Sequence, residues 1–432
     1  MSNTYPPAQS AMRRPLLTRL LTLAAPPMLA QQPAVRPLGP TVAVLADSLA
    51  GVGGVRDLGN GRVLVNDPRS RRLLLLDSTL SIVKVVADTG HAPMRYGARP
   101  GALIPYRADS TLFVDVTSAS MLVLDASGKV IRVMAVPRSQ DLGSLVNPAN
   151  GGAFFDPAGR LVYRLAPNVG AALRAAQATS GGGEFDVPPP PDSVPVLRVD
   201  LASRVVDTAA FLKVPVPRIH AKAAGNGFFD FNETINPLPF SDDWTVLSDG
   251  TIAIVRGRDY HVDWYSAGGQ HTASPKVPFA WERLTDEQKV VFVDSVRSIR
   301  QRIAAEEARA AAAAAAAKPE APRASSASGA PPERGASATP REPPPVNIVA
   351  PNDLPDYKPA FLANSTRADA DGNLWIRIQG GTVYDVVSRT GTVVDRVRVP
   401  EGRTIVGFGP GGAVYLASRD NGATKLERAR IR

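Results

Sequence analysis

Polar side chains recur at one position of this sequence, five residues after a turn residue that precedes a short apolar run. The six copies of this position carry Asn66, Asp115, Arg164, Val255, Arg377 and Ala417. Asp67 and Arg256 follow one position later in their copies and are weaker candidates. Arginine binds carboxylates and phosphates through two parallel hydrogen bonds. The two arginines at this position therefore favour an anionic small molecule as ligand.

Two explanations fit these residues. In the functional one, Asn66, Asp67, Asp115, Arg164, Arg256 and Arg377 belong to a polar ring that lines a ligand-binding pocket. In the structural one, Asp115 and Arg164 lie in adjacent copies and pair with each other, because a buried charge is costly without a partner. Both explanations stay open from the sequence.

Other motifs do not identify a reaction. The segment Asp369-Ala-Asp371-Gly-Asn373 has its glycine in the wrong place for a calcium loop and lacks the Glu at the twelfth position, so we interpret it as a hairpin turn. The four histidines show no metal-binding spacing. Cysteine is absent, which removes thiolate metal sites and a cysteine nucleophile. We expect no cofactor, and the catalytic residues, if any, are unassigned.

The polar positions belong to a repeated strand that follows a turn. Each copy has four to six apolar or alternating residues after Asn, Asp or Gly turn chemistry, which is typical of a buried strand that leaves a tight turn. The copies begin at Gly61, Ser110, Gly159, Gly250, Gly372 and Gly412. Most are followed by another strand, a second turn and an outer strand, and a less regular apolar segment precedes each copy. Four antiparallel strands every 40–50 residues are typical of a propeller blade.

The chain resembles a six-bladed β-propeller of the NHL-repeat or TolB-like type, as found in many exported bacterial proteins. The resemblance covers residues 41–281 and 346–432 and rests on the repeat and its turn residues. It predicts an all-β fold of four-stranded antiparallel blades. The last copy has no outer strand of its own, and we expect residues 41–45 to supply it and to close the ring.

The domain boundaries follow from the same repeat. Blades 1–4 and the closing strand occupy residues 41–281, and blades 5–6 occupy 346–432. A helical insertion is predicted at 282–318, beginning with a capping box formed by Thr285 and Gln288 and presenting an apolar stripe. The stripe consists of Phe292, Val296, Ile299 and Ile303. The Pro/Ala/Ser-rich segment 319–345 is expected to be a disordered linker.

Strand order predicts which side of the propeller carries function. Turns between first and second strands are short, whereas the segments expected on the opposite face are long and irregular. These are Ala87–Tyr106, Pro137–Gly151, Pro167–Pro195, Val216–Phe240 and Glu282–Phe361. Long loops on a rigid scaffold are where binding usually occurs. We therefore expect the site on this face, at the channel mouth.

The N-terminal residues indicate export. Arg13, Arg14 and Arg19 precede a short apolar run, and a small-residue cleavage site follows, so residues 1–30 are predicted to be a signal peptide, with Met12 as an alternative start. Residues 31–40 would be a linker. The mature chain is expected in the periplasm or outside the cell, without a membrane span. The net charge of +9 is spread along the chain, which argues against a nucleic-acid partner.

Together these features predict a non-catalytic propeller of the cell envelope that binds an unknown protein or an anionic small molecule. The alternative is a lactonase-like hydrolase or lyase with its site at the channel mouth. That resemblance implies a divalent cation such as Ca²⁺, to which Asn66, Asp67 and Asp115 could contribute. Arg164 and Arg377 would repel such a cation, so the match is poor.

Overall fold

The computed structural model describes Met1 and residues 32–181, 183–225, 228–316, 347–420 and 422–431. The chain from Pro33 to Arg432 forms one compact unit, separate from residues 1–32. The predicted signal peptide, apart from Met1, and the predicted linker 319–345 lie outside the described residues.

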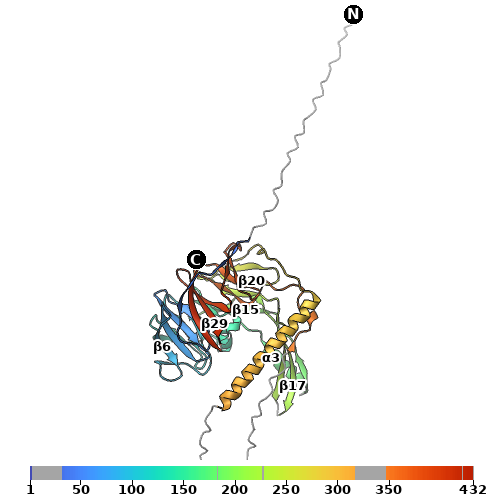
Figure 1. Ribbon diagram of the computed structural model, residues 1–432, viewed down its shortest axis with the longest axis horizontal. Coiled ribbons are helices and arrows are strands. Elements are labelled where there is room, and N and C mark those ends of the chain that lie inside the picture. The colour runs from blue at the N-terminus through green and yellow to red at the C-terminus, as the bar shows by residue number, and fades with distance from the viewer. Residues whose placement is uncertain (2–31, 182, 226–227, 317–346, 421, 432) are drawn as a thin grey trace, which may run out of the picture. The chain divides into compact units, whose positions relative to one another are not determined.

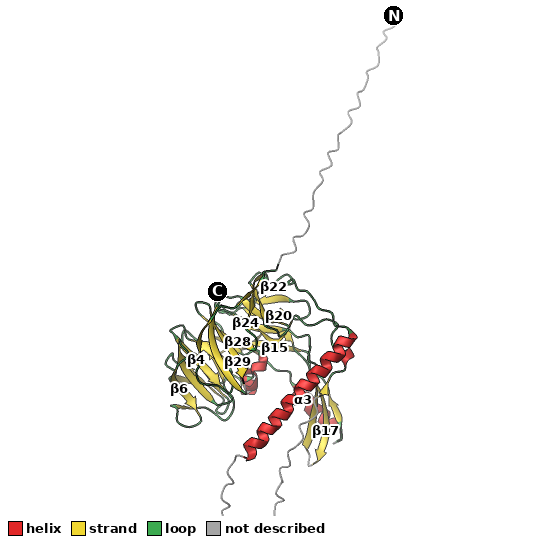
Figure 2. Ribbon diagram, viewed as in Figure 1, coloured by secondary structure: helices red, strands yellow, loops and turns green. Residues whose placement is uncertain are grey.

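The described chain is mainly β-structure, arranged in sheets whose strands are mostly consecutive in sequence (Figures 1 and 2). The first sheet contains β3 (Gly54–Asp57), β4 (Arg62–Asp67), β5 (Arg72–Asp77), β6 (Ile82–Asp88) and the short β7 (Met94–Arg95). The second contains β8 (Ala102–Pro105), β9 (Thr111–Asp115), β10 (Ser120–Leu124) and β11 (Val130–Ala135). The third contains β12 (Ala153–Phe155), β13 (Arg160–Arg164), β15 (Ser193–Asp200) and β16 (Val206–Lys213).

Three further sheets follow the same plan. The fourth contains β19 (Asp243–Val246), β20 (Ile252–Arg256), β21 (His261–Tyr265) and β22 (His271–Ala273). The fifth contains β24 (Phe361–Ala368), β25 (Leu374–Ile378), β26 (Val383–Val387), β27 (Val393–Arg398) and, parallel to β27, β1 (Val35–Pro37). The sixth contains β28 (Arg403–Gly409), β29 (Ala413–Asp420), β30 (Ala423–Arg430) and β2 (Thr41–Val44). In all six, the predicted repeat strand is second in order, after a less regular first strand.

Turn chemistry explains where these strands begin. Gly250 and Gly372 have positive φ values of 81° and 82°, a region that side chains with a Cβ rarely enter. Asp369 accepts hydrogen bonds from the backbone N–H groups of Asp371 at 3.0 Å and Asn373 at 2.8 Å. This segment is therefore the hairpin turn that its sequence predicted.

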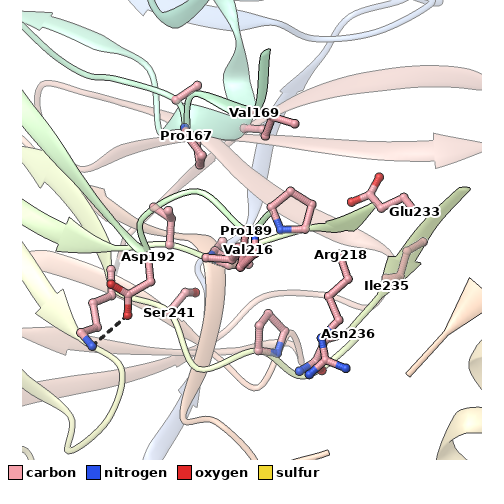
Figure 3. Close-up of a pocket in the computed structure, with 18 of the residues that line it drawn as sticks. Pro167, Val169, Pro189, Asp192, Val216, Arg218, Glu233, Ile235, Asn236 and Ser241 are labelled. Atoms are coloured by element: carbon pink, nitrogen blue, oxygen red, sulfur yellow. Dashed lines mark hydrogen bonds and ion pairs between the residues drawn. The ribbon is translucent and has the colours of Figure 1, made fainter. Parts of the chain in front are cut away.

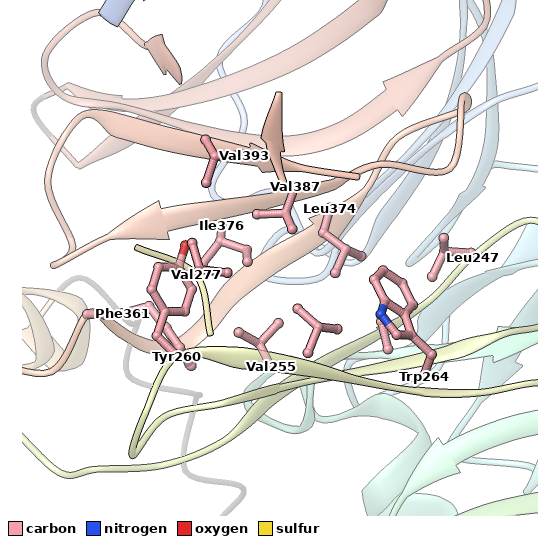
Figure 4. Packing of buried hydrophobic residues seen from close by; sticks show 13 residues of the cluster. Leu247, Val255, Tyr260, Trp264, Val277, Phe361, Leu374, Ile376, Val387 and Val393 are labelled. Carbon is pink, nitrogen blue, oxygen red and sulfur yellow. The ribbon is translucent and has the colours of Figure 1, made fainter. Parts of the chain in front are cut away.

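Apolar side chains between neighbouring sheets form the core. Figure 4 shows the cluster between the fourth and fifth sheets, where Val255 and Tyr260 lie against Ile376 and Val387. Similar clusters join the first sheet to the second, the second to the third, the third to the fourth and the fifth to the sixth. Fully burying one such side chain stabilises a protein by roughly 1.5–3 kcal/mol. The contacts between sheets therefore outweigh single turn hydrogen bonds of about 1 kcal/mol.

The last sheet packs on the first one. β28 lies beside β3, and a further cluster contains Val65 of the first sheet and Tyr415 of the sixth. The Tyr415 hydroxyl donates to Asp57 Oδ2 at 2.6 Å. β2 is the outer strand of the sixth sheet and pairs antiparallel with β30.

A seventh sheet was not predicted. It has the order β14 (Phe185–Val187), β17 (Arg218–Gly225), β18 (Phe228–Ile235) and β23 (Asn347–Ile348), so it combines three separate segments of the chain. α2 (Val169–Thr179) packs on β14. The expectation of irregular loops at 167–195 and 216–240 is therefore wrong. β17 and β18 form a local hairpin, and β14 and β23 pair with it across long sequence separations.

The long helix α3 (Asp286–Ala316) begins at the predicted capping box. The Thr285 N–H donates to Gln288 Oε1 at 2.9 Å, and the Gln288 N–H donates to Thr285 Oγ1 at 3.3 Å. The helix contacts β23 and overlaps the seventh sheet in the direction from which Figures 1 and 2 are drawn. Within the described residues, no helix combines the length and apolar character that crossing a membrane requires.

The predicted apolar stripe on this helix is only partly correct. Val293 is 1% exposed and packs with Leu284 and Leu354, whereas Ile299 and Ile303 are 47% and 44% exposed. Lys289, one turn before Val293, is buried and its Nζ lies 2.7 Å from Asp356 Oδ1. The helix therefore packs through its first turns.

Candidate functional site

A cavity of about 1530 Å³ lies between the third, fourth and fifth sheets and the seventh sheet. Its lining comes from four of the five long segments singled out in the sequence, all except Ala87–Tyr106. Figure 3 shows Pro167 and Val169 on one side of this space and Ser241 and Asn236 on the other. The long segments thus gather around one hollow large enough for a ligand.

Arg164 lies in the wall of this cavity at the end of β13. Its Nη2 donates to the Ala149 carbonyl at 2.8 Å and its Nη1 to the Leu165 carbonyl at 3.2 Å. The residue is only 8% exposed. Among the described residues no carboxylate lies within ion-pair distance of it. Burial lowers the pKa of the Arg164 guanidinium, and the more distant Asp243 carboxylate opposes that shift.

The Asp243 side chain forms a hydrogen bond with the fifth sheet. Its Oδ2 accepts a hydrogen bond from the Thr366 N–H at 2.7 Å. Burial raises the pKa of the Asp243 carboxyl group, whereas Arg367 and the Thr366 N–H act to lower it. The positive charge of Arg164 is therefore only weakly compensated at close range, which suits an anion in the cavity.

The other cationic side chains of the lining differ in their partners. Lys213 Nζ lies 3.0 Å from Asp192 Oδ2, and Arg218 Nη1 lies 3.1 Å from Asp353 Oδ2. Arg258 is exposed and makes no ion pair with any described residue. Arg164 and Arg258 are thus the two lining arginines whose charge is available to a ligand.

Three lining groups could take part in proton transfer. His220 Nδ1 lies 3.0 Å from Asp186 Oδ1, because β14 pairs with β17 and places the two residues opposite each other. Glu233 on β18 is exposed and has no ion-pair partner within the described residues. The Ser241 hydroxyl is buried and lacks a hydrogen-bond partner in the described part of the chain. A carboxylate-held imidazole and a free carboxylate are both suitable bases.

The six residues predicted from the repeat are not brought together at one site, and only Arg164 lines the cavity. Asn66 is fully buried, with Nδ2 donating to the Gly101 carbonyl at 2.8 Å and Oδ1 accepting from the Tyr96 hydroxyl at 2.9 Å. Asp67 is also fully buried and accepts hydrogen bonds from the N–H groups of Ala50, Gly51 and Ser70. Both side chains hold the backbone of the first two sheets.

The remaining predicted residues also have local partners. Asp115 accepts hydrogen bonds from the N–H groups of Thr117 and Ser118 in its own turn, so it does not pair with Arg164. Arg377 Nε donates to the Gly381 carbonyl at 2.7 Å. Arg256 lies 2.7 Å from Asp242 Oδ2 and 2.6 Å from Asp263 Oδ2.

These surroundings do not fit the divalent cation that the lactonase-like alternative implies. The oxygens of Asn66, Asp67 and Asp115 already accept hydrogen bonds from the protein. Within the described residues there is also no group of three His, Asp or Glu placed to hold a metal ion. The cavity instead presents Arg164, which suits an anion.

The cavity residues Arg258, His220 and Glu233 were missed by the sequence reasoning. Arg258 follows a repeat strand in the β20–β21 turn, outside the aligned position. The alternation Arg218-Ile219-His220-Ala221-Lys222 was a signal for β17 and for His220 on one of its faces. The sequence contained no signal for the contact between β17 and β14.

The sequence matches no protein-family model and no curated protein. Solved structures similar to the chain include a gluconolactonase from Xanthomonas campestris (TM-score 0.40, 11% identity, 93% of this chain and 97% of that one). They also include the calcium-binding protein regucalcin from Agrobacterium tumefaciens (TM-score 0.39, 13% identity, 92% and 98%). A third is virginiamycin B lyase from Staphylococcus aureus (TM-score 0.38, 10% identity, 90% and 98%).

The all-β architecture of propeller type is seen in the successive antiparallel sheets of the described chain. Two of the three proteins are named for an enzymatic activity, as a lactonase and as a lyase. These names do not match the expectation of a non-catalytic binding propeller, and they match its alternative, a lactonase-like hydrolase or lyase.

Proposed function

We propose that the chain is a hydrolase or lyase whose site is the cavity beside the seventh sheet, and that its substrate carries an anionic group. The observation that carries the proposal is Arg164, which is buried in the cavity wall and bound only by neutral carbonyl groups at close range. A substrate carboxylate would supply the missing negative charge, and charge-assisted hydrogen bonds of this kind are the strong ones.

Bond cleavage also needs a group that accepts and returns a proton. His220, held by Asp186, and Glu233 are the lining residues suited to that step. In a hydrolase one of them would take a proton from the attacking water. In a lyase it would take a proton from the carbon next to the substrate carboxylate, and the electron pair of that C–H bond would form a double bond to the adjacent carbon. The group on the adjacent carbon would leave and take up the returned proton, while Arg164 neutralises the carboxylate.

The scaffold we propose is a closed, six-bladed propeller of the NHL-repeat or TolB-like type, with the seventh sheet as an addition. Support comes from the six successive sheets and from the cluster that joins the last sheet to the first. We also propose that the mature chain is exported. The arginines and apolar residues before Gln31 support export, and N-terminal sequencing of the purified periplasmic protein would test it.

The catalytic proposal is tested by screening a panel of lactones and aryl esters, with and without a carboxylate group, by a pH-indicator assay in the presence and absence of EDTA. Carboxylated substrates should be turned over, and Arg164→Gln should raise KM at least tenfold. One of the two variants His220→Asn and Glu233→Gln, the one that removes the base, should lower kcat by a factor of about 10²–10⁴.

Arg132→Gln provides a matched control, since this exposed arginine lies on the outer strand β11, away from the cavity. Turnover in the control should equal that of the unchanged protein. The proposal is overturned if no member of the panel is turned over, or if turnover is the same in all three cavity variants.

A further inference from the structure

The volume of the cavity bears on the size of its ligand. Cavities that hold drug-sized molecules measure about 300–1000 Å³. The space here, at about 1530 Å³, is larger than a small hydroxy acid or a single sugar ring requires. A ligand that fills it must therefore extend well beyond the anionic group bound at Arg164.

Several proline, valine and isoleucine side chains lie among the polar side chains of the lining. Figure 3 shows Pro167 and Val169 on one side, Pro189 and Val216 in the middle, and Ile235 on β18. Exposed apolar groups that gather in one hollow mark binding grooves in soluble proteins. Proline side chains add rigidity, because the ring fixes the backbone φ angle.

One aromatic side chain of the lining is exposed but held in place. Phe240 is 40% exposed, and its ring lies 6.4 Å from the ring of Trp281. Trp281 packs edge-on against Phe279 at 5.2 Å, and Phe279 packs in the same way on the buried Tyr260 at 5.7 Å. This series of contacts anchors Phe240 to the core, so it presents a fixed apolar surface to the cavity.

We infer that the substrate is an amphiphilic carboxylic acid, which for a hydrolase also carries an ester or lactone group elsewhere in the molecule. Its large apolar body lies along the proline- and valine-lined wall, and its free carboxylate lies at a lining arginine. This inference rests on the proposed function, whose site it shares. It predicts that affinity grows with the apolar part, by roughly fourfold for each methylene group removed from water.

Binding by titration calorimetry tests the inference without any activity assay. The probes are butyrate, octanoate, 1-octanol and gluconate, each below the concentration at which it aggregates. Octanoate should bind at least tenfold more tightly than butyrate or gluconate. It should also bind more tightly than 1-octanol, which lacks the charge.

Two exposed positions provide variants that should not disturb folding, each with a matched control. Phe240→Ala should weaken octanoate binding at least threefold, whereas Phe211→Ala, on the outer strand β16 and 56% exposed, should not. Arg258→Gln should weaken octanoate binding but not 1-octanol binding, and Arg132→Gln should change neither.

The outcomes separate this inference from the proposed function. If butyrate or gluconate binds as tightly as octanoate, or if Phe240→Ala has no effect, the amphiphilic substrate is overturned while the cavity can still be an active site. If 1-octanol equals octanoate and Arg258→Gln changes nothing, the carboxylate is overturned. If octanoate binds as expected but no ester or lactone is turned over, the proposed function alone fails.

Discussion

Arginine side chains at the ends of the repeat strands have three different surroundings. Arg164 faces the cavity and binds only carbonyl oxygens at close range, whereas Arg256 contacts Asp242 and Asp263. Arg377 holds the carbonyl of Gly381 in its own turn. The repeat fixes where each backbone position lies, but the neighbouring segments decide what each side chain contacts.

Replacing Arg256 should therefore destabilise the fold. In Arg256→Met, Asp242 and Asp263 would lose their shared cation while remaining almost buried, which costs about 3 kcal/mol in comparable buried pairs. Arg377→Met, which removes one hydrogen bond, should cost about 1 kcal/mol. Urea unfolding measures both values. Equal losses in the two variants would contradict the structural role given to Arg256.

Asn66 should likewise act on stability and not on ligand binding. In Asn66→Ala, the Tyr96 hydroxyl and the Gly101 carbonyl lose a buried hydrogen-bond partner, with an expected loss of about 2 kcal/mol. Adding Ca²⁺ should leave the melting temperature of both proteins unchanged. A Ca²⁺-dependent rise that disappears in Asn66→Ala would instead make Asn66 a metal ligand.

Aspartates give the turns between strands a common chemistry. The carboxylates of Asp77, Asp88 and Asp200 accept hydrogen bonds from N–H groups two to four residues later. The Thr79 hydroxyl contributes most to lowering the pKa of Asp77, followed by the Ser81 N–H. The N–H groups of Ala92 and Ser203 are the largest causes of the lowered pKa values of Asp88 and Asp200.

These shifts predict a loss of stability in acid. Each folded-state pKa lies below the ordinary value of 3.8, so the stabilisation is present above pH 3.8 and is lost as the pH falls through the lowered values. Changing all three residues to Asn keeps a hydrogen-bond acceptor but removes the titration. The triple variant should lose less of its melting temperature between pH 7 and about pH 3.

The matched control is Asp47→Asn, an exposed aspartate that makes no hydrogen bond with the described residues. It should follow the unchanged protein over the whole pH range. A triple variant that melts in parallel with the control would show that the turn aspartates do not cause the acid sensitivity.

The strands of the six successive sheets could be predicted because their signals are local. Apolar runs bounded by Asp-Gly turns pair with their neighbours in sequence, as in β25 and β26. The seventh sheet could not be predicted in this way, because β14 pairs with β17 and β18 with β23 over long separations. β14 and β23 have only three and two residues, so tertiary contacts give them strand structure, whereas β17 and β18 form a local hairpin.

The helix α3 packs on the rest of the chain only through its first turns, and this leads to a prediction for the inserted segment that follows them. Its buried side chains Lys289 and Val293 lie in the first turns, and Ile303 is already exposed. Deleting residues 304–345 should therefore change the melting temperature by no more than about 1 °C. Val293→Asp should lower it by several degrees, because it places a charge among apolar residues. A large drop on deletion would show that the removed segment packs on the rest of the chain.

The candidate site forms only when segments distant in the sequence come together in the folded chain. Strand order indicated which segments would meet, and four of the five do line the cavity. Among the residues that give it chemistry, Arg258 lies in the β20–β21 turn, whereas His220 and Glu233 lie in the β17–β18 hairpin of the seventh sheet. A repeat alignment compares equivalent positions, so it cannot identify residues that each occur once.

Closure between the ends of the chain is the feature of the whole molecule most open to test. If β2 completes the sixth sheet, a chain that starts after Leu45 should expose the edge of β30. It should also lose the burial of Leu45, which packs with Val65 and Leu426. Removing one such buried leucine costs about 2–5 kcal/mol, and an uncovered edge strand favours aggregation.

The comparison uses two truncated chains, one starting at Pro33 and one at Ala46. The first should melt at the same temperature as the unchanged protein, because it keeps the whole compact unit Pro33–Arg432. The second should melt several degrees lower by calorimetry and should scatter more light on standing. A cysteine pair at Ala43 and Arg428, which lie opposite each other, should raise the melting temperature when oxidised. If the two truncated chains melt alike, β2 does not hold the ends of the propeller together.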